Sequence, residues 1–454
     1  QDKMFKDNGE LFYPAFPGDP FYDDFITGEG AILPPDIFPG GGPTGLAEFF
    51  GDHMVVNGKI WPKMDVEPRN YRLRLLNGCD SRFLVIRFRA VPLGETDFTN
   101  AGALLPFTVV GSDQGLASET TTTDTLVAET GSRYDIVFDF GDFDGKRIIM
   151  ENIGGDTPFG FSYGDDLDPE DVFPDRQTDR IMAFDVNLPF DNLVPDVSPA
   201  SGALATYAAA REAAYGGYQL GTADRTRKVA LFEGTDEYGR LQPLLGTAEP
   251  ATDFTDKNPI NWPATPVYQA AGLTGQMEGS IAWHSPTTEN PALGDTERWE
   301  VFNVTGDSHP VHLHLVHFEV VERREIIWDS HTIGEGDLLP GGGTAGPDDE
   351  TRLIPNNYYQ TPANDGTYLV SQPVIQHNST IDPTTWGNGF KIGNPTFDLT
   401  ETVDPGDEYV DATSPKDMVT ARPGEVTVIK AKFDKPGRYV WHCHILSHED
   451  HEMM

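Results

Sequence analysis

Short strand-like segments separated by turn dipeptides constrain the fold of this chain more than any other feature. Segments rich in β-branched and aromatic residues, which partly alternate polar with apolar side chains, span residues 71–76, 107–110, 134–140 and 147–150. The turn dipeptides between such segments are Asn57-Gly58, Asn77-Gly78 and Asp144-Gly145. With 47 Gly and 36 Pro in the chain, this spacing predicts an all-β fold, built as a sandwich or a barrel.

The length of 454 residues is typical of two or three domains. Strand-like segments stop near residue 190 and resume at residue 228, and the residues between them include one plausible short helix at 208–214. We therefore predict a β domain over residues 1–190, a linker over 191–225 and a second β domain over 226–454. Residues 329–415 are rich in Gly, Pro, Asp and Asn, so we expect long loops there.

The charge of the chain is strongly negative, because 72 Asp and Glu outnumber 32 Lys and Arg for a net charge of −40. Such a balance excludes nucleic-acid binding through a basic surface. With 38% hydrophobic and 11% aromatic residues along the chain, we expect packed cores under an acidic shell rather than disorder. Asp outnumbers Glu and Arg outnumbers Lys, which indicates a halophilic protein whose self-repulsion is screened by salt.

Cysteines and apolar runs are scarce. The chain has only Cys79 and Cys443, so at most one disulfide could form. No run of 18 apolar residues occurs, and we predict no membrane span. The first residues, Gln1 to Met4, match neither an initiator methionine nor a signal peptide, so we expect a processed or truncated start.

Two clusters hold eight of the twelve histidines, four within residues 309–317 and four within residues 442–451. The residues that form the two motifs are His309, His312 and His314 in the first cluster, and His442, Cys443, His444, His448 and Met453 in the second. Alternate side chains of a strand share one face, with roughly 7 Å between their Cα atoms. His312 and His314 should therefore point together, as should His442 and His444, while Cys443 points the opposite way.

This alternation predicts two metal sites, one made of imidazoles alone and one that uses the Cys443 thiolate. Two histidines and a cysteine with a distant, weak methionine form the ligand set of a blue-copper electron-transfer centre. Cys443, His448 and Met453 are spaced so that one loop can wrap a single metal, and His309 can supply the remaining ligand. Zinc is the competing metal, but structural zinc sites normally close with four Cys or His in local pairs and do not use methionine.

We expect the other histidines not to bind metal. We predict structural roles for the isolated His53, His284, His331 and His377. His317 and His451 lie beside the clusters, and we favour non-ligand roles for both.

The two histidine motifs resemble those of the multicopper oxidases, and the surrounding sequence is similar to the branch of bacterial spore-coat laccases and bilirubin oxidases. Further stretches that resemble this branch are residues 8–14, 56–62, 67–69, 132–135 and 236–240. The resemblance covers nearly the whole chain except the linker and residues 329–415. It implies that the two β domains are cupredoxin-like Greek-key domains, equivalent to the second and third of the three domains in the family.

The resemblance also implies a set of copper ligands. Cys443, His309 and His448 would bind type 1 copper, with Met453 as a weak axial ligand. His312 would bind type 2 copper, and His314, His442 and His444 the type 3 pair. The family's reaction is one-electron oxidation of phenolic or similar substrates at type 1 copper, coupled to four-electron reduction of O₂ to water. By the same analogy His448 would accept the substrate's electron, and Glu449 is a candidate proton donor.

The sequence lacks part of the family's ligand set, because four of the eight histidines of the trinuclear cluster come from the family's first domain. We therefore expect a separate N-terminal cupredoxin polypeptide, produced by cleavage or by its own gene, to complete the enzyme. The alternative is a single blue-copper electron-transfer or copper-binding protein. A two-domain nitrite reductase or laccase that shares copper between subunits is a third reading, although the lack of further His-x-His pairs weighs against it.

The reducing substrate stays open among phenols, bilirubin, aromatic amines and low-valent metal ions, all of which the family oxidises. An acidic surface should favour cationic reductants at low salt. The family is often exported, and Asn378-Ser379-Thr380 is a candidate glycosylation acceptor. We therefore expect an extracellular or cell-surface location.

Overall fold

Strands dominate the chain in a computed structural model, which describes residues 1–19, 45–173, 176–196, 220–236, 241–254, 257–270, 273–283, 285–327, 330–332, 353–355, 374–375, 396–397 and 413–454. The α-helices among these residues are α3 (Pro266–Ala270) and α4 (Leu446–Asp450), and the 3₁₀ helices are η2 (Gly164–Asp166), η3 (Pro169–Asp171) and η4 (Gln177–Asp179). None of the described helices is long and apolar enough to cross a bilayer. The prediction of an all-β fold is confirmed. The helix predicted at 208–214 lies outside the described residues.

The first group of strands forms a sandwich. Its members are β1 (Asp2–Phe5), β2 (Leu11–Phe12), β3 (His53–Val56), β4 (Lys59–Ile60), β5 (Lys63–Val66), β6 (Asn70–Leu76), β7 (Leu84–Pro92), β8 (Phe107–Ser112), β9 (Gly115–Thr123), β10 (Leu126–Ala128), β11 (Arg133–Asp139), β12 (Lys146–Asn152) and β13 (Arg180–Val186). They pair in the orders β2-β1-β3-β4, β10-β7-β12-β13-β5 and β6-β11-β8-β9. The sheets β10-β7-β12-β13-β5 and β6-β11-β8-β9 enclose a core that includes Phe88, Ile136, Phe138 and Ile148, as their alternating apolar residues predict.

The second group of strands contains a large sheet, a small three-stranded sheet and the strand pair β20-β21. Its members are β14 (Arg225–Asp236), β15 (Leu241–Thr247), β16 (Gly279–Ser280), β17 (Thr296–Asn303), β18 (His309–Leu313), β19 (Phe318–Ile327), β20 (Ser330–Thr332), β21 (Leu353–Pro355), β22 (Val374–Ile375), β23 (Thr396–Phe397), β24 (Met418–Ala421), β25 (Glu425–Lys432) and β26 (Trp441–Cys443). The large sheet has the order β16-β15-β14-β17-β25-β19-β23, with β22 paired to β14. The small sheet has the order β24-β18-β26, and it carries both histidine motifs.

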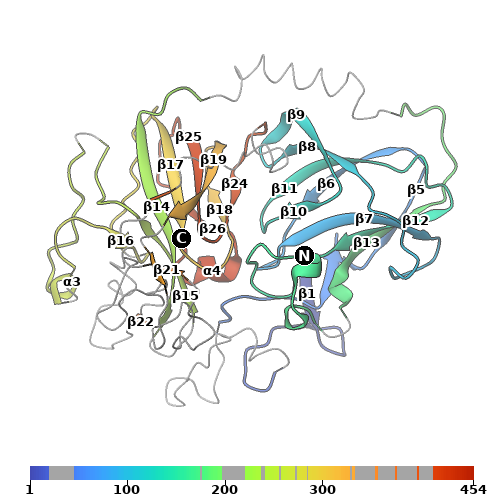
Figure 1. The fold of residues 1–454 in the computed structure, drawn as a ribbon, viewed down its shortest axis with the longest axis horizontal. Helices are drawn as coiled ribbons and strands as arrows, with labels where there is room; N and C mark the ends of the chain where they lie inside the picture. Colours follow the sequence, from blue (N-terminus) through green and yellow to red (C-terminus); the bar gives the residue numbers. More distant parts are fainter. Residues whose placement is uncertain are drawn as a thin grey trace.

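The two groups lie side by side and share a core (Figure 1). Among the described residues no sheet joins strands of both groups. One buried cluster nevertheless contains Val301 and Val311 of the second group together with Phe83 and Val85 of the first. The domain boundaries at residues 190 and 226 stay predictions, since residues 197–219 lie outside the description.

Polar contacts also join the two groups beside the histidine motifs. The Ser112 and Ser414 hydroxyl oxygens are 3.0 Å apart, and the Gln114 N–H donates to the Pro415 carbonyl at 3.1 Å. At the other end of the contact, the Ser447 hydroxyl donates to the Asp80 carboxylate at 2.9 Å. The first group of strands therefore reaches the small sheet from two sides.

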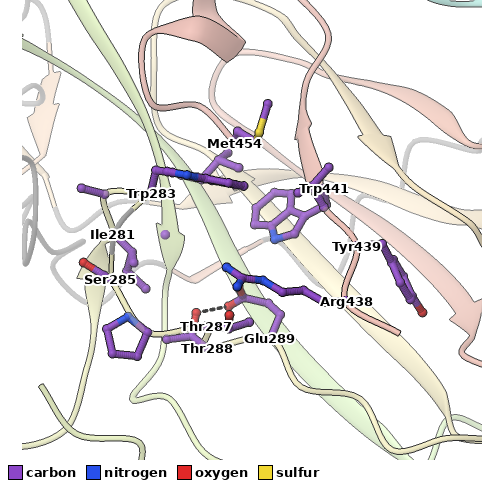
Figure 2. Close-up of a pocket in the computed structure, with 15 residues that line it drawn as sticks. Ile281, Trp283, Ser285, Thr287, Thr288, Glu289, Arg438, Tyr439, Trp441 and Met454 are labelled. Carbon is purple, nitrogen blue, oxygen red and sulfur yellow. Dashed lines mark hydrogen bonds between the residues drawn. The ribbon is translucent and has the colours of Figure 1, made fainter. Parts of the chain in front are cut away.

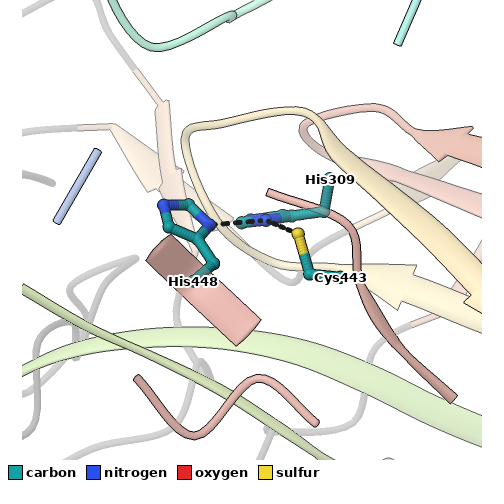
Figure 3. Close-up of side chains that lie close together, drawn as sticks. All are labelled: His309, Cys443 and His448. Atoms are coloured by element: carbon teal, nitrogen blue, oxygen red, sulfur yellow. Dashed lines mark hydrogen bonds between the residues drawn. The ribbon is translucent and has the colours of Figure 1, made fainter. Parts of the chain in front are cut away.

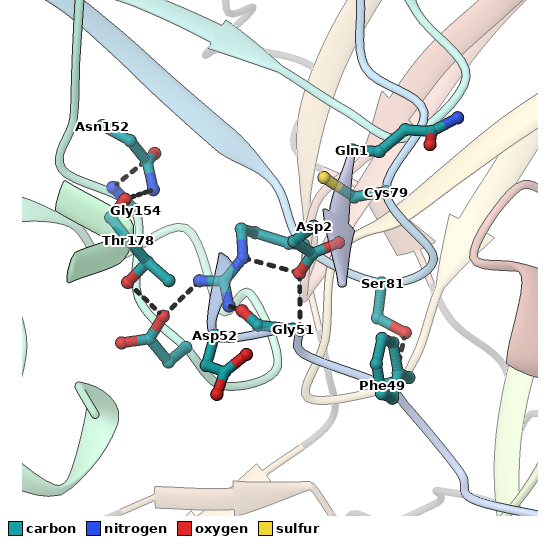
Figure 4. Close-up of polar contacts among 12 residues, drawn as sticks. Gln1, Asp2, Phe49, Gly51, Asp52, Cys79, Ser81, Asn152, Gly154 and Thr178 are labelled. Carbon is teal, nitrogen blue, oxygen red and sulfur yellow. Dashed lines mark hydrogen bonds and ion pairs between the residues drawn. The ribbon is translucent and has the colours of Figure 1, made fainter. Parts of the chain in front are cut away.

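A buried ion network fixes the segment that approaches α4 from the first group. The guanidinium of Arg82 is fully buried, and its Nε donates to Asp2 Oδ2 at 2.8 Å. Asp2 Oδ2 also accepts the Gly51 N–H at 2.8 Å, and the Phe49 N–H donates to the Ser81 hydroxyl at 3.0 Å (Figure 4). Because these hydrogen bonds join Asp2 and Ser81 to the backbone of Gly51 and Phe49, the network holds this segment in place.

Candidate metal centre

The pairing of β18 with β26 creates two faces with different chemistry. The strands are antiparallel, with Val311 opposite Cys443 and His312 opposite His442. Since side chains alternate along a strand, His312 and His442 share one face of the small sheet while Cys443 lies on the other. The structure therefore places the imidazole cluster and the cysteine back to back.

The cysteine face brings together three fully buried side chains (Figure 3). Cys443 Sγ lies 3.6 Å from His309 Nδ1, and His448 Nδ1 lies 3.4 Å from the same atom. His309 begins β18, Cys443 ends β26, and His448 comes from α4, the short helix that follows β26. Two imidazole nitrogens and one sulfur thus converge within 4.8 Å of one another, which is the spacing that a single metal ion requires.

Oxygen atoms lie beside the far nitrogens of both His309 and His448. His309 Nε2 is 2.7 Å from Thr305 Oγ1 and 3.3 Å from Glu233 Oε1. His448 Nε2 is 3.2 Å from Glu48 Oε1. An Nε2–H of His309 directed at Thr305 Oγ1 leaves the lone pair of its Nδ1 free to face Cys443 Sγ, the usual outer arrangement of a metal-ligating histidine. Glu48 lies close to His448 Nε2 without a hydrogen bond to it.

Met453 is fully buried and its backbone is tied to the same residues. The Cys443 N–H donates to the Met453 carbonyl at 3.0 Å, and the Met453 N–H donates to the His448 carbonyl at 3.0 Å. These bonds close the loop from Cys443 to Met453 around the site, as the sequence spacing predicts.

The protonation of this site suits a metal. Burial lowers the pKa of both His309 and His448 to about 4, so the rings are neutral ligands at pH 7. Burial raises the pKa of the Cys443 thiol well above its usual value, and nearby carboxylates add to that rise. A bound cation would supply the positive charge that a Cys443 thiolate needs here. The donor set of two imidazoles and one thiol therefore fits copper.

The opposite face gathers four imidazoles. The ligand atoms of His312, His314 and His442 lie within 4.8 Å of one another, and His314 Nε2 is 3.0 Å from His442 Nε2. The His444 ring joins them, with centroid distances of 5.8 Å to His312 and 5.5 Å to His442. Burial lowers the pKa of His442 to about 4 and also lowers the pKa of His312 and His444.

Backbone carbonyls fix the rings of this imidazole cluster. His312 Nδ1 lies 2.7 Å from the Asp417 carbonyl oxygen, and His442 Nδ1 lies 2.9 Å from the Cys443 carbonyl oxygen. With Nδ1–H donating in both cases, each Nε2 is left for a metal. The first group of strands supports this arrangement because Arg133 Nη2 donates to Asp417 Oδ2 at 2.7 Å.

Glu449 lies beside this cluster rather than at the cysteine site. Its Oε2 is 3.1 Å from His442 Nδ1, although Glu449 is the sequence neighbour of His448. Burial, followed by the charge of Asp450, raises the pKa of the Glu449 carboxyl. The carboxyl can therefore hold a proton next to the imidazole cluster.

The other histidines whose side chains the structure describes, His53, His317 and His451, join neither group. His317 and His451 belong to neither set of converging ligand atoms among the described residues. The His53 ring stacks on Trp61 with centroids 5.0 Å apart, and its Nδ1 meets Asp52. His284, His377 and the candidate glycosylation site at Asn378 lie outside the described residues, as does the side chain of His331.

Comparison with known proteins places these motifs in context. The sequence model of the multicopper oxidase family matches residues 253–352 and 387–454. A laccase of Bacillus subtilis is 28% identical over all of this chain and 60% of its own length, and a laccase of Bacillus stratosphericus is 27% identical over all of this chain and 61% of its own length. A bilirubin oxidase of Albifimbria verrucaria is 26% identical over 90% of this chain and 48% of its own length.

The chain spans about three fifths of the length of the two Bacillus laccases. Among solved structures, the multicopper oxidase McoA of Aquifex aeolicus aligns with a TM-score of 0.46 and 19% identity, over 100% of this chain and 63% of its own.

Proposed function

We propose that this chain, whose residues 253–352 and 387–454 match the sequence model of the multicopper oxidase family, is the larger part of a laccase-like oxidase. The reaction is one-electron oxidation of phenolic or similar substrates, coupled to four-electron reduction of O₂ to water. The observation that carries the proposal is the back-to-back placement of the Cys443 site and the imidazole cluster on one pair of strands. Copper ions at these two sites would supply the redox steps.

In this proposal each chain residue has a defined role. His309, Cys443 and His448 would hold type 1 copper, with Met453 as a weak axial ligand. His312 would hold type 2 copper, and His314, His442 and His444 would hold type 3 copper. Cys443 is bonded through the backbone to the two histidines at positions 442 and 444, so an electron that arrives at the sulfur has a short covalent route to the imidazole cluster.

Protons follow a separate route. Glu449 is the proposed proton donor for O₂ reduction, because its carboxyl touches His442 and holds a proton more readily than a free glutamate. The surface of the chain would draw in cationic species at low salt. His448 is the proposed point of electron entry.

We also propose that the missing imidazoles come from a further cupredoxin domain, cleaved from this chain or encoded apart. Four imidazoles converge in the described structure, whereas a trinuclear cluster of this family uses eight. The Bacillus relatives are longer than this chain, which supports a further domain. An extracellular or cell-surface location and adaptation to high salt belong to the same proposal.

Elemental analysis of copper and a denaturing gel of the purified protein test this proposal. Near four coppers per chain, a companion of about one cupredoxin domain and steady O₂ consumption with 2,6-dimethoxyphenol are expected. About one copper per chain with no companion would instead show a single blue-copper electron-transfer protein. That result would overturn the proposal that this chain is part of an oxidase.

A low-valent metal ion is a second candidate substrate, favoured by carboxylates at the type 1 site. Glu48 and Glu233 each place an oxygen within 3.3 Å of a site imidazole. Glu48 is buried, and its Oε2 has no hydrogen-bond partner. Burial, then the charges of Glu233 and Asp80, raise the pKa of Glu48 well above its usual range. A divalent cation would satisfy these oxygens.

The variant Glu48→Gln separates the two substrates. It keeps an oxygen at the position of Glu48 Oε1 but removes the charge. We expect the KM for Fe(II) to rise at least tenfold and the KM for 2,6-dimethoxyphenol to change less than threefold. Glu10→Gln, which removes an exposed carboxylate, is the matched control. Equal changes for both substrates would remove Fe(II) from the candidates.

A further inference from the structure

Two adjoining cavities lie beside β26, away from the carboxylates of the type 1 site. Their volumes are about 110 Å³ and about 370 Å³. Both are lined by Thr287, Glu289 and residues 438–441, so they form one depression that we call the aromatic groove. The larger cavity alone is within the size range of small-molecule sites.

Aromatic rings form the walls of this groove. Trp283 and Trp441 face the smaller cavity, with Met454 beside them (Figure 2). The Trp441 ring packs edge-on against Trp299 at 5.6 Å, which fixes its position. Trp283 is 42% exposed, a large apolar surface to leave in water. Such a wall suits a flat aromatic ring, which gains both burial and stacking.

The charges in the groove differ from those of the rest of the surface. Arg438 is exposed and has no hydrogen-bond or ion-pair partner among the residues that the structure describes. This is unusual in a chain with 72 acidic and 32 basic residues. A free guanidinium presents a planar fork of donors that matches a carboxylate. The Glu289 carboxylate, which accepts the Thr288 hydroxyl at 2.6 Å, lines the same groove and can accept a phenolic hydroxyl.

We infer that the aromatic groove binds phenolic carboxylates as reducing substrates. The ring lies against Trp283 and Trp441, the carboxylate pairs with Arg438, and the hydroxyl faces Glu289. This inference rests on the proposed function, since it names a substrate class and a second route of electron entry. With copper held at the Cys443 site, the bound phenol would give one electron to that metal, which would pass from Cu(II) to Cu(I), and one hydroxyl proton to the Glu289 carboxylate.

The position of Trp441 makes this route short. Trp441 precedes His442 and Cys443 in β26, so one peptide unit joins the wall of the groove to His442 and two join it to Cys443. The net charge of −40 opposes the approach of an anion at low salt. In molar salt the Debye length falls to about 3 Å, so the repulsion is screened and the local contact with Arg438 determines whether the anion binds.

Binding, measured without turnover, tests the inference. We would titrate the purified protein with ferulate (4-hydroxy-3-methoxycinnamate) and with its methyl ester by calorimetry, without O₂ and at fixed molar salt. Arg438→Gln should weaken ferulate binding at least tenfold and leave ester binding within twofold. Trp283→Ala should weaken the binding of both ligands. The control is Arg74→Gln, an exposed arginine that lines a different cavity.

Each outcome supports or overturns the inference. If Arg438→Gln and Arg74→Gln affect ferulate equally, or if Trp283→Ala leaves both ligands unaffected, the groove is not the binding site. If the parent protein binds ferulate but shows no blue absorption band, the proposed function is wrong and the groove remains a ligand site. A normal blue band without ferulate binding to the parent protein would defeat the inference alone.

Discussion

The two histidine sites share β18 and β26 but differ in how this chain encloses them. At the Cys443 site all three ligand side chains are fully buried, and carboxylates or a hydroxyl of this chain meet the outer nitrogen of each ring. In the imidazole cluster the His312 side chain is 18% exposed, and its support is the backbone carbonyl of Asp417, a residue whose carboxylate pairs with Arg133. The difference shows that this chain by itself encloses the Cys443 site, whereas it leaves part of the adjacent imidazole cluster open.

The largest expected effect comes from removing the sulfur that distinguishes the two sites. Cys443→Ser should abolish the intense visible absorption, because the band arises from the copper–thiolate bond, and should lower phenol oxidation at least a thousandfold. Copper bound by the imidazole cluster should remain. Cys79→Ser, which alters the other buried free cysteine, is the control that should keep the band. Visible spectra and copper analysis measure both variants, and a persistent band in Cys443→Ser would disprove the type 1 assignment.

The stability of the copper-free chain should depend on pH because the Cys443 site is buried. The folded-state pKa of His309 is lowered to about 4, so between pH 4 and about 6.5 the unfolded chain binds a proton that the folded chain does not. The contribution of His309 to stability is therefore present above pH 6.5 and is lost as the pH falls through this window, by up to about 3 kcal/mol. Buried Glu48, whose pKa is raised, acts in the opposite direction.

The variant His309→Asn isolates that contribution. We expect the pH dependence of the unfolding midpoint between pH 7 and 4.5 to be less steep in the variant than in the parent chain. The difference between the two proteins should not change between pH 7 and 8, which serves as the internal control. Parallel curves through the whole range would show that His309 does not titrate as its burial indicates.

Much of the fold and of the grouping of the histidine and cysteine side chains could be predicted because the signals are local. Alternation along a strand sufficed to assign His312 and His442 to one face and Cys443 to the other, and the pairing of β18 with β26 has that arrangement. The spacing from Cys443 to Met453 indicated a closing loop, and backbone hydrogen bonds close it. These features depend on residues a few positions apart, where periodicity is informative.

The groups that orient the ligands were not predicted, because their signals are not local. Glu48 meets His448 across 400 positions, and it arrives on a segment held by the buried Arg82 network. Arg133 reaches Asp417 from the other group of strands. Nothing in the pattern around Glu48 or Arg133 distinguishes it from surface charge in so acidic a chain. Only Thr305, close to His309 in sequence, offered a local signal.

A smaller effect on copper binding should show that different residues support the two sites. Hydrogen bonding and the charge of Arg133 outweigh burial and keep the pKa of Asp417 low, and the Asp417 carbonyl holds His312. Arg133→Gln should therefore weaken copper binding by the imidazole cluster about 10-fold to 100-fold, the usual cost of losing an outer support. The blue band should be unchanged.

Copper titration of Arg133→Gln with visible detection measures both sites at once. Arg87→Gln, which alters an arginine within the same group of strands that bonds to Thr125, is the matched control and should change neither. Equal weakening of both sites in Arg133→Gln would mean that the contact between the two groups of strands supports the whole small sheet rather than His312.

The smallest expected effect concerns the axial position at the enclosed site. Met453 is fully buried and is held by backbone bonds to Cys443 and His448, so Met453→Leu should remove a weak sulfur donor without opening the site. Loss of that donor destabilises Cu(II) relative to Cu(I), and the reduction potential should rise by on the order of 60 mV, a tenfold change in a one-electron equilibrium. Met277→Leu, equally buried but in a satellite core, should leave the potential unchanged. A lower potential in Met453→Leu would mean that Met453 is not the weak ligand of the copper. Another residue of the loop would then take that position.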